Sequence, residues 1–258
     1  MRSDSVRKMN EMLGKEYLTN SSGKCFVIGY KNNRNVVVAF YEPFYITTCE
    51  LGDLKKGKVK NHLKPSLYGV GYVGVGDYSS NNKRAFGLWV SMLKRGYSED
   101  FKSLCPTYKD VTVCDEWLNF QNFAAWCYSQ NFFEAKDDKG GSYHLDKDGV
   151  VRGSKIYSPE TCSFVPREIN NLWVDYVKNS GKSSTGVFQT QTGSGSRFTA
   201  RIMIQRKSKV LGVFNTQEEA RDVHIVAKSE YVKSVAEKWK HGVDSKVYEA
   251  LLNIDFTS

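Results

Sequence analysis

The segment "YHLDKDGVVRGSKIYSPETCSFVPREIN", residues 143–170, decides the architecture in the middle of this 258-residue chain. It opens with the alternation of a strand, passes through a loop containing Gly and Ser, and ends where a helix can begin. Pro166 suits a first helical position, and Glu168 suits the first turn. Apolar residues then recur at helical spacing, namely Ile169, Leu172, Trp173, Tyr176 and Val177. The segment predicts a strand, a loop and a helix.

Three side chains at the start of this segment could carry chemistry. If "HLDKD" is extended, His144, Asp146 and Asp148 share one face and Leu145 points towards the core. Mg²⁺ prefers hard oxygen ligands, and a nearby imidazole can take the proton from an attacking water. This pattern is typical of a one-metal nuclease. An alternative remains open, in which the aspartates bond to backbone amides in a turn and His144 lies on the surface.

Upstream, residues 14–66 are expected to form a small twisted β-module, as a five-stranded barrel of the Tudor type. The runs "KCFVIGY" and "NVVVAFY" are separated by "KNNR" and predict a hairpin, and "YITTCEL" predicts a third strand. A basic connector follows at residues 52–66. Its lysines could contact phosphates or could form a solvated edge that discourages strand pairing; they are Lys55, Lys56, Lys58 and Lys60.

The glycine-rich residues 68–80 are interpreted as a linker, because they lack the ending of a phosphate-binding loop. Two amphipathic helices are expected after it, one around residues 83–95 and one starting after Asp115 as N-cap. Beyond residue 185, three strands precede a helix from Thr216 to about Trp239, which opens with a capping box formed with Glu219. The fold class is therefore α+β, with domains at residues 1–66, 67–178 and 179–258.

The charge distribution favours an anionic partner. The chain has a formal net charge of +9 and a pI of about 9.1. Residues 181–240 hold 11 Lys and Arg residues and 5 acids, and every acid lies on the predicted helix. In "RFTARIMI", Phe198, Ala200, Ile202 and Ile204 alternate with Arg197, Thr199, Arg201 and Met203. The predicted sheet thus has one apolar face for the helix and one basic face for a partner.

Residues 66–175 resemble a family of phage HNH-like proteins, which carry the ββα-metal nuclease motif. The resemblance lies in "LWVSMLKRGYSEDFKSLCPTYKDVTVCDEWLNFQNFAAW", "LDKD" and "YSPETC". It implies His144 as general base, Asp146 as the acidic catalytic residue after it and a metal ligand, Asp148 and Asn170 as further ligands, and one Mg²⁺ or Mn²⁺ per site. Glu160 and Thr161 would lie nearby, and Thr161 stands where many members have an Asn. The predicted helix after this loop has no histidine at the position where the family can have a metal-binding histidine.

The C-terminal part resembles the APETALA2-type DNA-binding domain, through "STGVF", "RFTARI" and "KVLGVFNTQEEARDVHIVAK". In that family a three-stranded sheet enters the major groove of double-stranded DNA. The resemblance implies that DNA is contacted by basic and polar sheet residues, here Lys182, Arg197, Thr199, Arg201, Arg206, Lys207 and Lys209. The tryptophans of the family's sheet are absent, and Phe198 is the nearest aromatic residue.

Two functions follow as alternatives. The first is a phage-type HNH homing endonuclease that hydrolyses DNA phosphodiester bonds with Mg²⁺. The second is a catalytically inactive DNA-binding protein on the same scaffold, such as a regulator, an accessory factor or an inhibitor of host functions. The intact "HLDKD" face favours the first, whereas Thr161 and the missing helix histidine favour the second. A protein partner could also bind residues 1–66, with DNA only as a tether.

The chain opens without a secretory signal and has no apolar stretch of membrane-spanning length. We therefore expect a cytoplasmic protein that does not enter a membrane, in the host cytoplasm if a phage encodes it.

Overall fold

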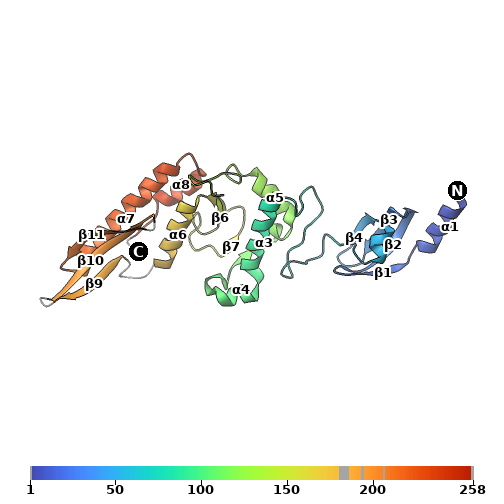
Figure 1. Cartoon of the computed structure of the whole chain (residues 1–258), viewed down its shortest axis with the longest axis horizontal. Coiled ribbons are helices and arrows are strands. Elements are labelled where there is room, and N and C mark those ends of the chain that lie inside the picture. Colours follow the sequence, from blue (N-terminus) through green and yellow to red (C-terminus); the bar gives the residue numbers. More distant parts are fainter. Residues whose placement is uncertain (1, 180–185, 193–194, 206, 257–258) are drawn as a thin grey trace. The chain divides into compact units, whose positions relative to one another are not determined.

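The computed structural model describes residues 2–179, 186–192, 195–205 and 207–256 (Figure 1). The chain divides into two compact units, residues 1–125 and 126–258, and the division falls inside helix α5 (Phe120–Ser129). Both units combine helices with small antiparallel sheets, so the predicted α+β class is confirmed at this level. The predicted domain boundaries after residues 66 and 178 stay predictions.

The N-terminal β-module begins with α1 (Arg2–Met12) and contains a four-stranded antiparallel meander. Its strands, in sheet order, are β1 (Glu16–Thr19), β2 (Gly23–Asn32), β3 (Asn35–Phe40) and β4 (Tyr45–Cys49). The predicted hairpin and the strand after it are confirmed. One face of the sheet is buried, because alternate residues such as Val27, Val38 and Phe40 form a common core.

One prediction for this module is wrong, because residues 2–66 contain four strands, not the five of the expected barrel. The predicted basic connector also contains an element that we did not expect, since helix α2 (Leu51–Lys55) forms at its start. Leu51 and Leu54 are buried in the core of the sheet, and their spacing of three residues suits one helical turn.

The glycine-rich segment 68–80, predicted as a linker, is packed against the start of α5. The buried Gln121 donates from Nε2 to the carbonyls of Val73 and Tyr78, at 2.9 and 2.8 Å. At Gly74 a Cβ atom would lie 2.1 Å from Oδ1 of Asn119. Gly74 is therefore needed for close packing of this backbone rather than for a loose connection.

The remaining helices of the first unit follow this segment. They are α3 (Lys83–Tyr97), α4 (Glu99–Leu104), the 3-10 turns η1 (Pro106–Tyr108) and η2 (Asp115–Leu118), and α5, with the short β5 (Thr112–Val113) between the turns. Asp115 is thus not the N-cap of α5 as predicted. The amide of Tyr72 bonds to the carbonyl of Leu118, and the amide of Phe120 to the carbonyl of Tyr72, so these contacts interrupt the helix at Asn119.

The second unit contains the segment that opened the sequence analysis and the C-terminal sheet. Its first elements are β6 (His144–Asp146), β7 (Ile156–Tyr157), β8 (Ser163–Val165) and α6 (Arg167–Asn179). The sheet that follows has the order β11-β10-β9, and is formed by β9 (Val187–Thr192), β10 (Gly195–Ile204) and β11 (Lys207–Phe214). Helix α7 (Gln217–Trp239) covers one face of it (Figure 1). The predicted three-stranded sheet backed by a helix is confirmed.

Helix α7 starts as predicted, and a further helix follows it. The amide of Glu219 donates to Oγ1 of Thr216 at 3.2 Å, and the carboxylate of Glu219 accepts from the amide of Thr216, which completes the capping box. Helix α8 (Ser245–Leu252), which we did not predict, buries Val247 and Leu251. Eight residues with two buried apolar positions give too weak a periodic signal in the sequence.

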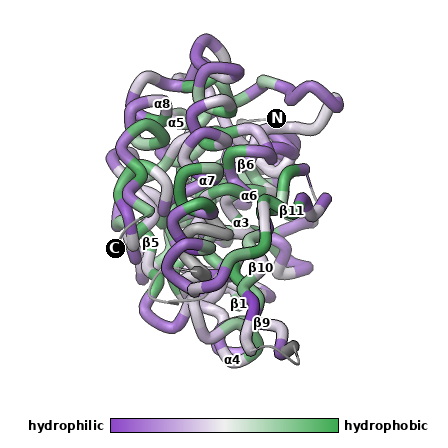
Figure 2. The backbone as a smooth tube through the Cα atoms, turned by 90° about the vertical axis from the view of Figure 1, so that its left-hand side faces the viewer, coloured by the Kyte–Doolittle hydropathy of each residue, from purple (hydrophilic) through white to green (hydrophobic). Residues whose placement is uncertain are grey.

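Hydropathy changes over short stretches of the chain (Figure 2). Within the described residues, no helix has both the length and the apolar character needed to cross a membrane. All six cysteines are free thiols.

Candidate functional site

The segment 143–170 folds into two short antiparallel strands that are followed directly by α6. His144 pairs with Val165, Leu145 with Phe164 and Asp146 with Ser163. Leu145 is buried, as expected, and His144 and Asp146 share the other face of β6. The strand ends at Asp146, so alternation does not bring Asp148 to that face.

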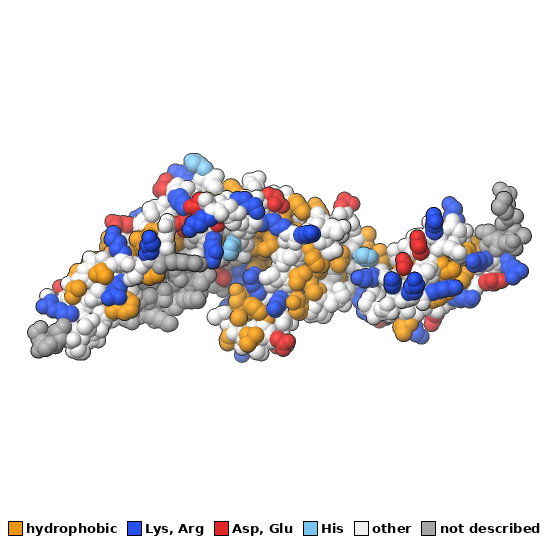
Figure 3. Space-filling view, in the orientation of Figure 1, with side chains coloured by type: hydrophobic (Ala, Val, Ile, Leu, Met, Phe, Trp, Pro, Cys, Tyr) orange, Lys and Arg blue, Asp and Glu red, His pale blue; other side chains and the backbone are white. Residues whose placement is uncertain are grey.

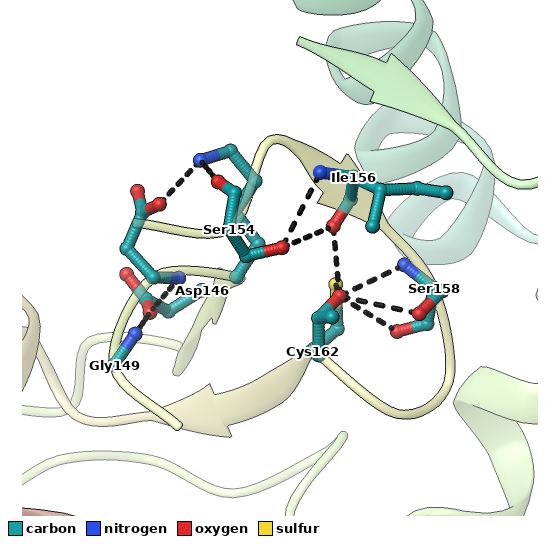
Figure 4. Close-up of polar contacts among 9 residues, drawn as sticks. Asp146, Gly149, Ser154, Ile156, Ser158 and Cys162 are labelled. Atoms are coloured by element: carbon teal, nitrogen blue, oxygen red, sulfur yellow. Dashed lines mark hydrogen bonds and ion pairs between the residues drawn. The ribbon is translucent and has the colours of Figure 1, made fainter. Parts of the chain in front are cut away.

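The carboxylate of Asp146 closes the turn after β6 (Figure 4). Its Oδ2 accepts hydrogen bonds from the amides of Asp148 and Gly149, at 2.9 and 2.8 Å. Burial raises the pKa of Asp146 to about 6; the nearby Asp148 also raises it, whereas the two amides and Lys147 lower it. The aspartate–amide turn considered in the sequence analysis is therefore present at this residue.

The next acid, Asp148, is paired with a buried lysine. Nζ of Lys147 donates to Oδ1 of Asp148 at 2.5 Å and to the carbonyl of Ser154 at 2.8 Å. Lys147 is only 6% exposed, so its ammonium group needs these partners. Charge compensation at this bend thus comes from the chain itself.

Thr161 fixes the other end of the loop (Figure 4). Its Oγ1 donates to the carbonyl of Ile156 at 2.8 Å and accepts from the amide of Ser158 at 3.1 Å. Beside it, burial raises the pKa of Cys162 to about 12, so this thiol stays neutral. A single hydroxyl therefore makes the loop contacts at a position where the resembling family often has an Asn.

The remaining predicted residues of this site are Glu160, Asn170 and His144, and they differ in exposure. Glu160 is exposed, and its pKa is lowered, most of all by a hydrogen bond with the side chain of Ser158. Asn170 lies half-buried near the start of α6, and its backbone N–H donates to the carbonyl of Pro166. His144 is exposed on β6.

This donor set fits a divalent cation poorly. In the part of the chain that the structure describes, no group of three or more His, Cys, Asp or Glu side chains is placed to hold a metal ion. Oδ2 of Asp146 is engaged by two amides, and Asp148 is engaged by an ammonium group that would repel a cation. One Mg²⁺ or Mn²⁺ held by Asp146, Asp148 and Asn170 stays a prediction.

A contact that the sequence did not reveal joins α6 to the end of α7. Oε2 of Glu168 accepts from Nζ of Lys238 at 2.6 Å and from Nε1 of Trp239 at 2.9 Å. Asp138 takes part as well, accepting from Lys238 at 2.8 Å. These partners are about 70 to 100 residues apart in sequence, so no local pattern could have identified them.

The C-terminal sheet has the two predicted faces. Val187, Phe198, Ala200, Leu211 and Phe214 pack with Ala220 of α7 on one side. We call the other side the open face. By strand pairing it includes Phe188, Thr190, Arg197, Thr199, Arg201, Met203, Ser208, Val210 and Val213.

The arginines of the open face are exposed and held by neighbours on the same side. The guanidinium of Arg201 lies 5.2 Å from the centre of the Phe188 ring, and Arg197 donates to Oδ1 of Asn215. Phe188, Met203, Val210 and Val213 are each more than half exposed. The open face therefore offers both cations and apolar groups to a partner.

The pairing of β10 with β11 places the predicted DNA-contacting residues on two different sides of the sheet. Lys209 pairs with Ile202 and Lys207 with Ile204, so both lysines belong to the side of the sheet that carries α7, although they are exposed. A bulge between Ala200 and Arg201 contributes to this arrangement. Lys182 and Arg206 lie outside the described residues.

Comparison of the chain with protein-family models, curated proteins and solved structures finds no match.

Proposed function

We propose that this protein binds double-stranded DNA through the open face of the β9–β11 sheet. The observation that carries the proposal is the charge of this sheet. Residues 186–215 contain five Lys and Arg residues and no acid, and Arg197 and Arg201 are exposed on the side away from α7. A polyanion such as DNA is therefore attracted by the basic side chains of residues 186–215 and is not repelled by any acid within them.

The remaining chemistry of the open face suits a DNA groove. A guanidinium can bind the O6 and N7 atoms of a guanine, or a phosphate, through two parallel hydrogen bonds. Phe188, Val210 and Val213 can contact thymine methyl groups in the major groove. Stacking on Phe188 restricts Arg201 before binding, which lowers the entropy lost when it contacts a base.

In this proposal the β6–β8 hairpin and α6 serve as scaffold. Asp146, Lys147 and Thr161 are each engaged in hydrogen bonds within their own loop. The contacts of Glu168 with Lys238 and Trp239 attach the hairpin's helix to the helix that covers the DNA-binding sheet. The inactive DNA-binding alternative is therefore the function that this geometry supports best.

The test compares two double variants by fluorescence anisotropy with a labelled duplex. Arg197→Ala with Arg201→Ala should weaken DNA binding by about 10- to 100-fold, because two charged contacts are lost. The matched control is Lys155→Ala with Lys233→Ala, which removes the same charge from two exposed residues of the same unit. Equal binding by both variants would refute the proposal.

A second candidate is the metal-dependent endonuclease, with His144 and Asp146 as catalytic residues. It is favoured by one observation, that these two side chains share a face of β6 in a strand–strand–helix segment. The test incubates supercoiled plasmid with the protein and Mg²⁺, Mn²⁺ or EDTA. Asp146→Asn is the informative variant, because an amide oxygen can still accept from the turn amides while the carboxylate is gone.

Metal-dependent nicking that disappears in Asp146→Asn, while the variant still binds DNA, would establish the endonuclease. If the wild-type protein binds DNA but does not nick it with either metal, the endonuclease is excluded and the β6–β8 hairpin serves only as scaffold. Nicking that persists in Asp146→Asn would exclude Asp146 as a metal ligand.

A further inference from the structure

The N-terminal β-module carries a strip of basic side chains that the C-terminal sheet does not explain. We define the lysine strip as residues 55–64, "KKGKVKNHLK", which contain five lysines and one histidine. Exposure alternates strictly along its centre: Lys56, Lys58, Lys60 and His62 are exposed, whereas Gly57, Val59 and Asn61 are buried. From Lys58 to His62 this alternation is that of an extended chain, in which every second side chain points the same way. Lys56 and Gly57 lie in the turn that ends α2.

Two of the buried positions, Gly57 and Val59, anchor the strip to the β-module. Gly57 accepts a hydrogen bond from the amide of Asn20 at 2.8 Å. Its φ is +66°, and a Cβ atom there would lie 2.7 Å from Oδ1 of Asn20, so the site requires glycine. Val59 is buried in the core of the β-module.

Asn61 provides the third anchor and uses its amide fully. Its Nδ2 donates to the carbonyl of Pro43 at 2.7 Å, and its Oδ1 accepts from the amide of Leu63 at 3.0 Å. Its own amide donates to Oγ of Ser22 at 2.9 Å. The lysines between these anchors are therefore presented by a fixed backbone.

The lysines of the strip are not neutralised. Within the described residues, Lys55, Lys56, Lys58, Lys60 and Lys64 form no ion pair, although Lys24 of the same module does pair with Glu16. The sequence contains no acid from residue 54 to residue 76. Acids on adjacent elements are Glu50 at the N-cap of α2, Asp53 in α2, Glu42 before Pro43, and Glu16, which is already bonded to Tyr41 and Lys24.

We infer that the lysine strip is a second DNA contact, which binds the phosphate backbone without reading sequence. Lys58 and Lys60 stand on one side of an extended chain, about 6 to 7 Å apart, and Lys56 is exposed in the turn just before them. A group of neighbouring cations without acidic partners, on an anchored backbone, matches a polyanion. The visible face of this module carries gathered Lys and Arg side chains (blue, right-hand part of Figure 3).

The alternative reading, that these lysines only protect a sheet edge, is less satisfactory. The strip bonds to the end of β1, the edge strand, through Asn20, so this edge is already covered there by backbone. Edge protection also does not require several lysines at regular spacing with no acidic partner. The inference goes beyond the proposed function, because it concerns the other unit of the chain.

The test measures DNA affinity of the full chain at a series of salt concentrations. The strip variant combines Lys56→Ser, Lys58→Ser and Lys60→Ser, and the matched control combines Lys15→Ser, Lys31→Ser and Arg34→Ser, three other exposed bases of the same module. Each phosphate contact contributes about 0.9 to the slope of log K against log salt. We expect the strip variant to lower the magnitude of that slope by about 2 to 3, and the control to leave it unchanged.

An unchanged slope in the strip variant, or an equal loss in the control, would overturn the inference. The Arg197→Ala, Arg201→Ala variant separates the two proposals, because loss of binding there with a normal strip variant would leave only the proposed function standing. A strip variant that loses DNA binding while the arginine variant binds normally would leave only the lysine strip as a DNA contact. A parallel arm with phosphatidylserine vesicles identifies the partner: a strip variant that loses vesicle binding and keeps its full DNA slope would also overturn the inference.

Discussion

At the scale of the residue, the same side chain types serve chemistry or structure depending on their hydrogen bonds. Asp146, Asp148 and Thr161 stand in a sequence pattern typical of a metal site. In the structure Asp146 accepts two amides, Asp148 pairs with Lys147, and Thr161 bonds to Ile156 and Ser158. In a catalytic role, Asp146 would act while one of its carboxylate oxygens, Oδ2, already accepts hydrogen bonds from two backbone amides.

Asp146 makes a prediction for stability against pH. Its folded pKa is about 6, above the ordinary value of 3.8, so the folded state holds the proton more tightly than the unfolded state. This contribution to stability is present in full below about pH 4 and is lost as the pH rises through 6. Asp146→Asn should therefore have a higher free energy of unfolding than the wild type at pH 7.5, by on the order of 1 kcal/mol for a half-buried group, and a higher melting temperature.

Thermal unfolding of both proteins from pH 4 to pH 8 checks this. The difference between variant and wild type should appear between pH 4 and 6 and stay constant above that range. A difference in stability that does not change with pH would mean that folding does not raise the pKa of this carboxyl group. That result is expected if a bound cation stabilises the carboxylate.

At the scale of the element, helix α7 links two parts of the second unit. Its first half packs on the β9–β11 sheet through Ala220, and its last turn contacts α6 through Lys238 and Trp239. Ring packing adds to this end, because Tyr143 meets Trp239 edge-on at 6.1 Å and donates to the carbonyl of Gly242 at 2.9 Å. We expect Glu168 to be the residue on which this connection depends most.

Glu168→Ala should lower the free energy of unfolding by about 1 to 3 kcal/mol, because Nε1 of the buried Trp239 is left without its acceptor. Glu168→Gln should cost less, since an amide oxygen can still accept from the indole. Urea unfolding measures both. A glutamine variant as destabilised as the alanine variant would show that the charge, rather than the indole contact, holds the two helices together.

At the scale of the whole molecule, the positive charge is concentrated in two acid-free stretches. Residues 54–76 and residues 186–215 each contain five Lys and Arg residues, in a chain whose formal net charge is +9. One stretch belongs to the first unit and the other to the second. In our proposals the first supplies contacts to phosphates and the second supplies contacts that can depend on sequence.

The local elements were largely predictable from the sequence, because their signals are local. The alternation in "RFTARIMI", the "KNNR" turn and the capping box of Thr216 each act within a few residues, and the structure confirms the strands, the hairpin and the helix that they predict. The α5 start was missed because backbone bonds from Tyr72, far away in sequence, interrupt the helix. The same distance in sequence hid the packing of the glycine-rich segment on Gln121.

By itself, then, the sequence determined most of the longer strands and helices, which face of each is apolar, and where positive charge lies without acids. Only the tertiary structure decided that Asp146 and Thr161 are engaged by backbone groups, that Lys207 and Lys209 lie on the other side of the sheet from Arg201, and that Lys56, Lys58 and Lys60 are exposed between buried neighbours. The physical reason is that periodicity and turn chemistry act between neighbours in the chain. Hydrogen-bond partners and strand register depend on groups that meet only when the chain has folded.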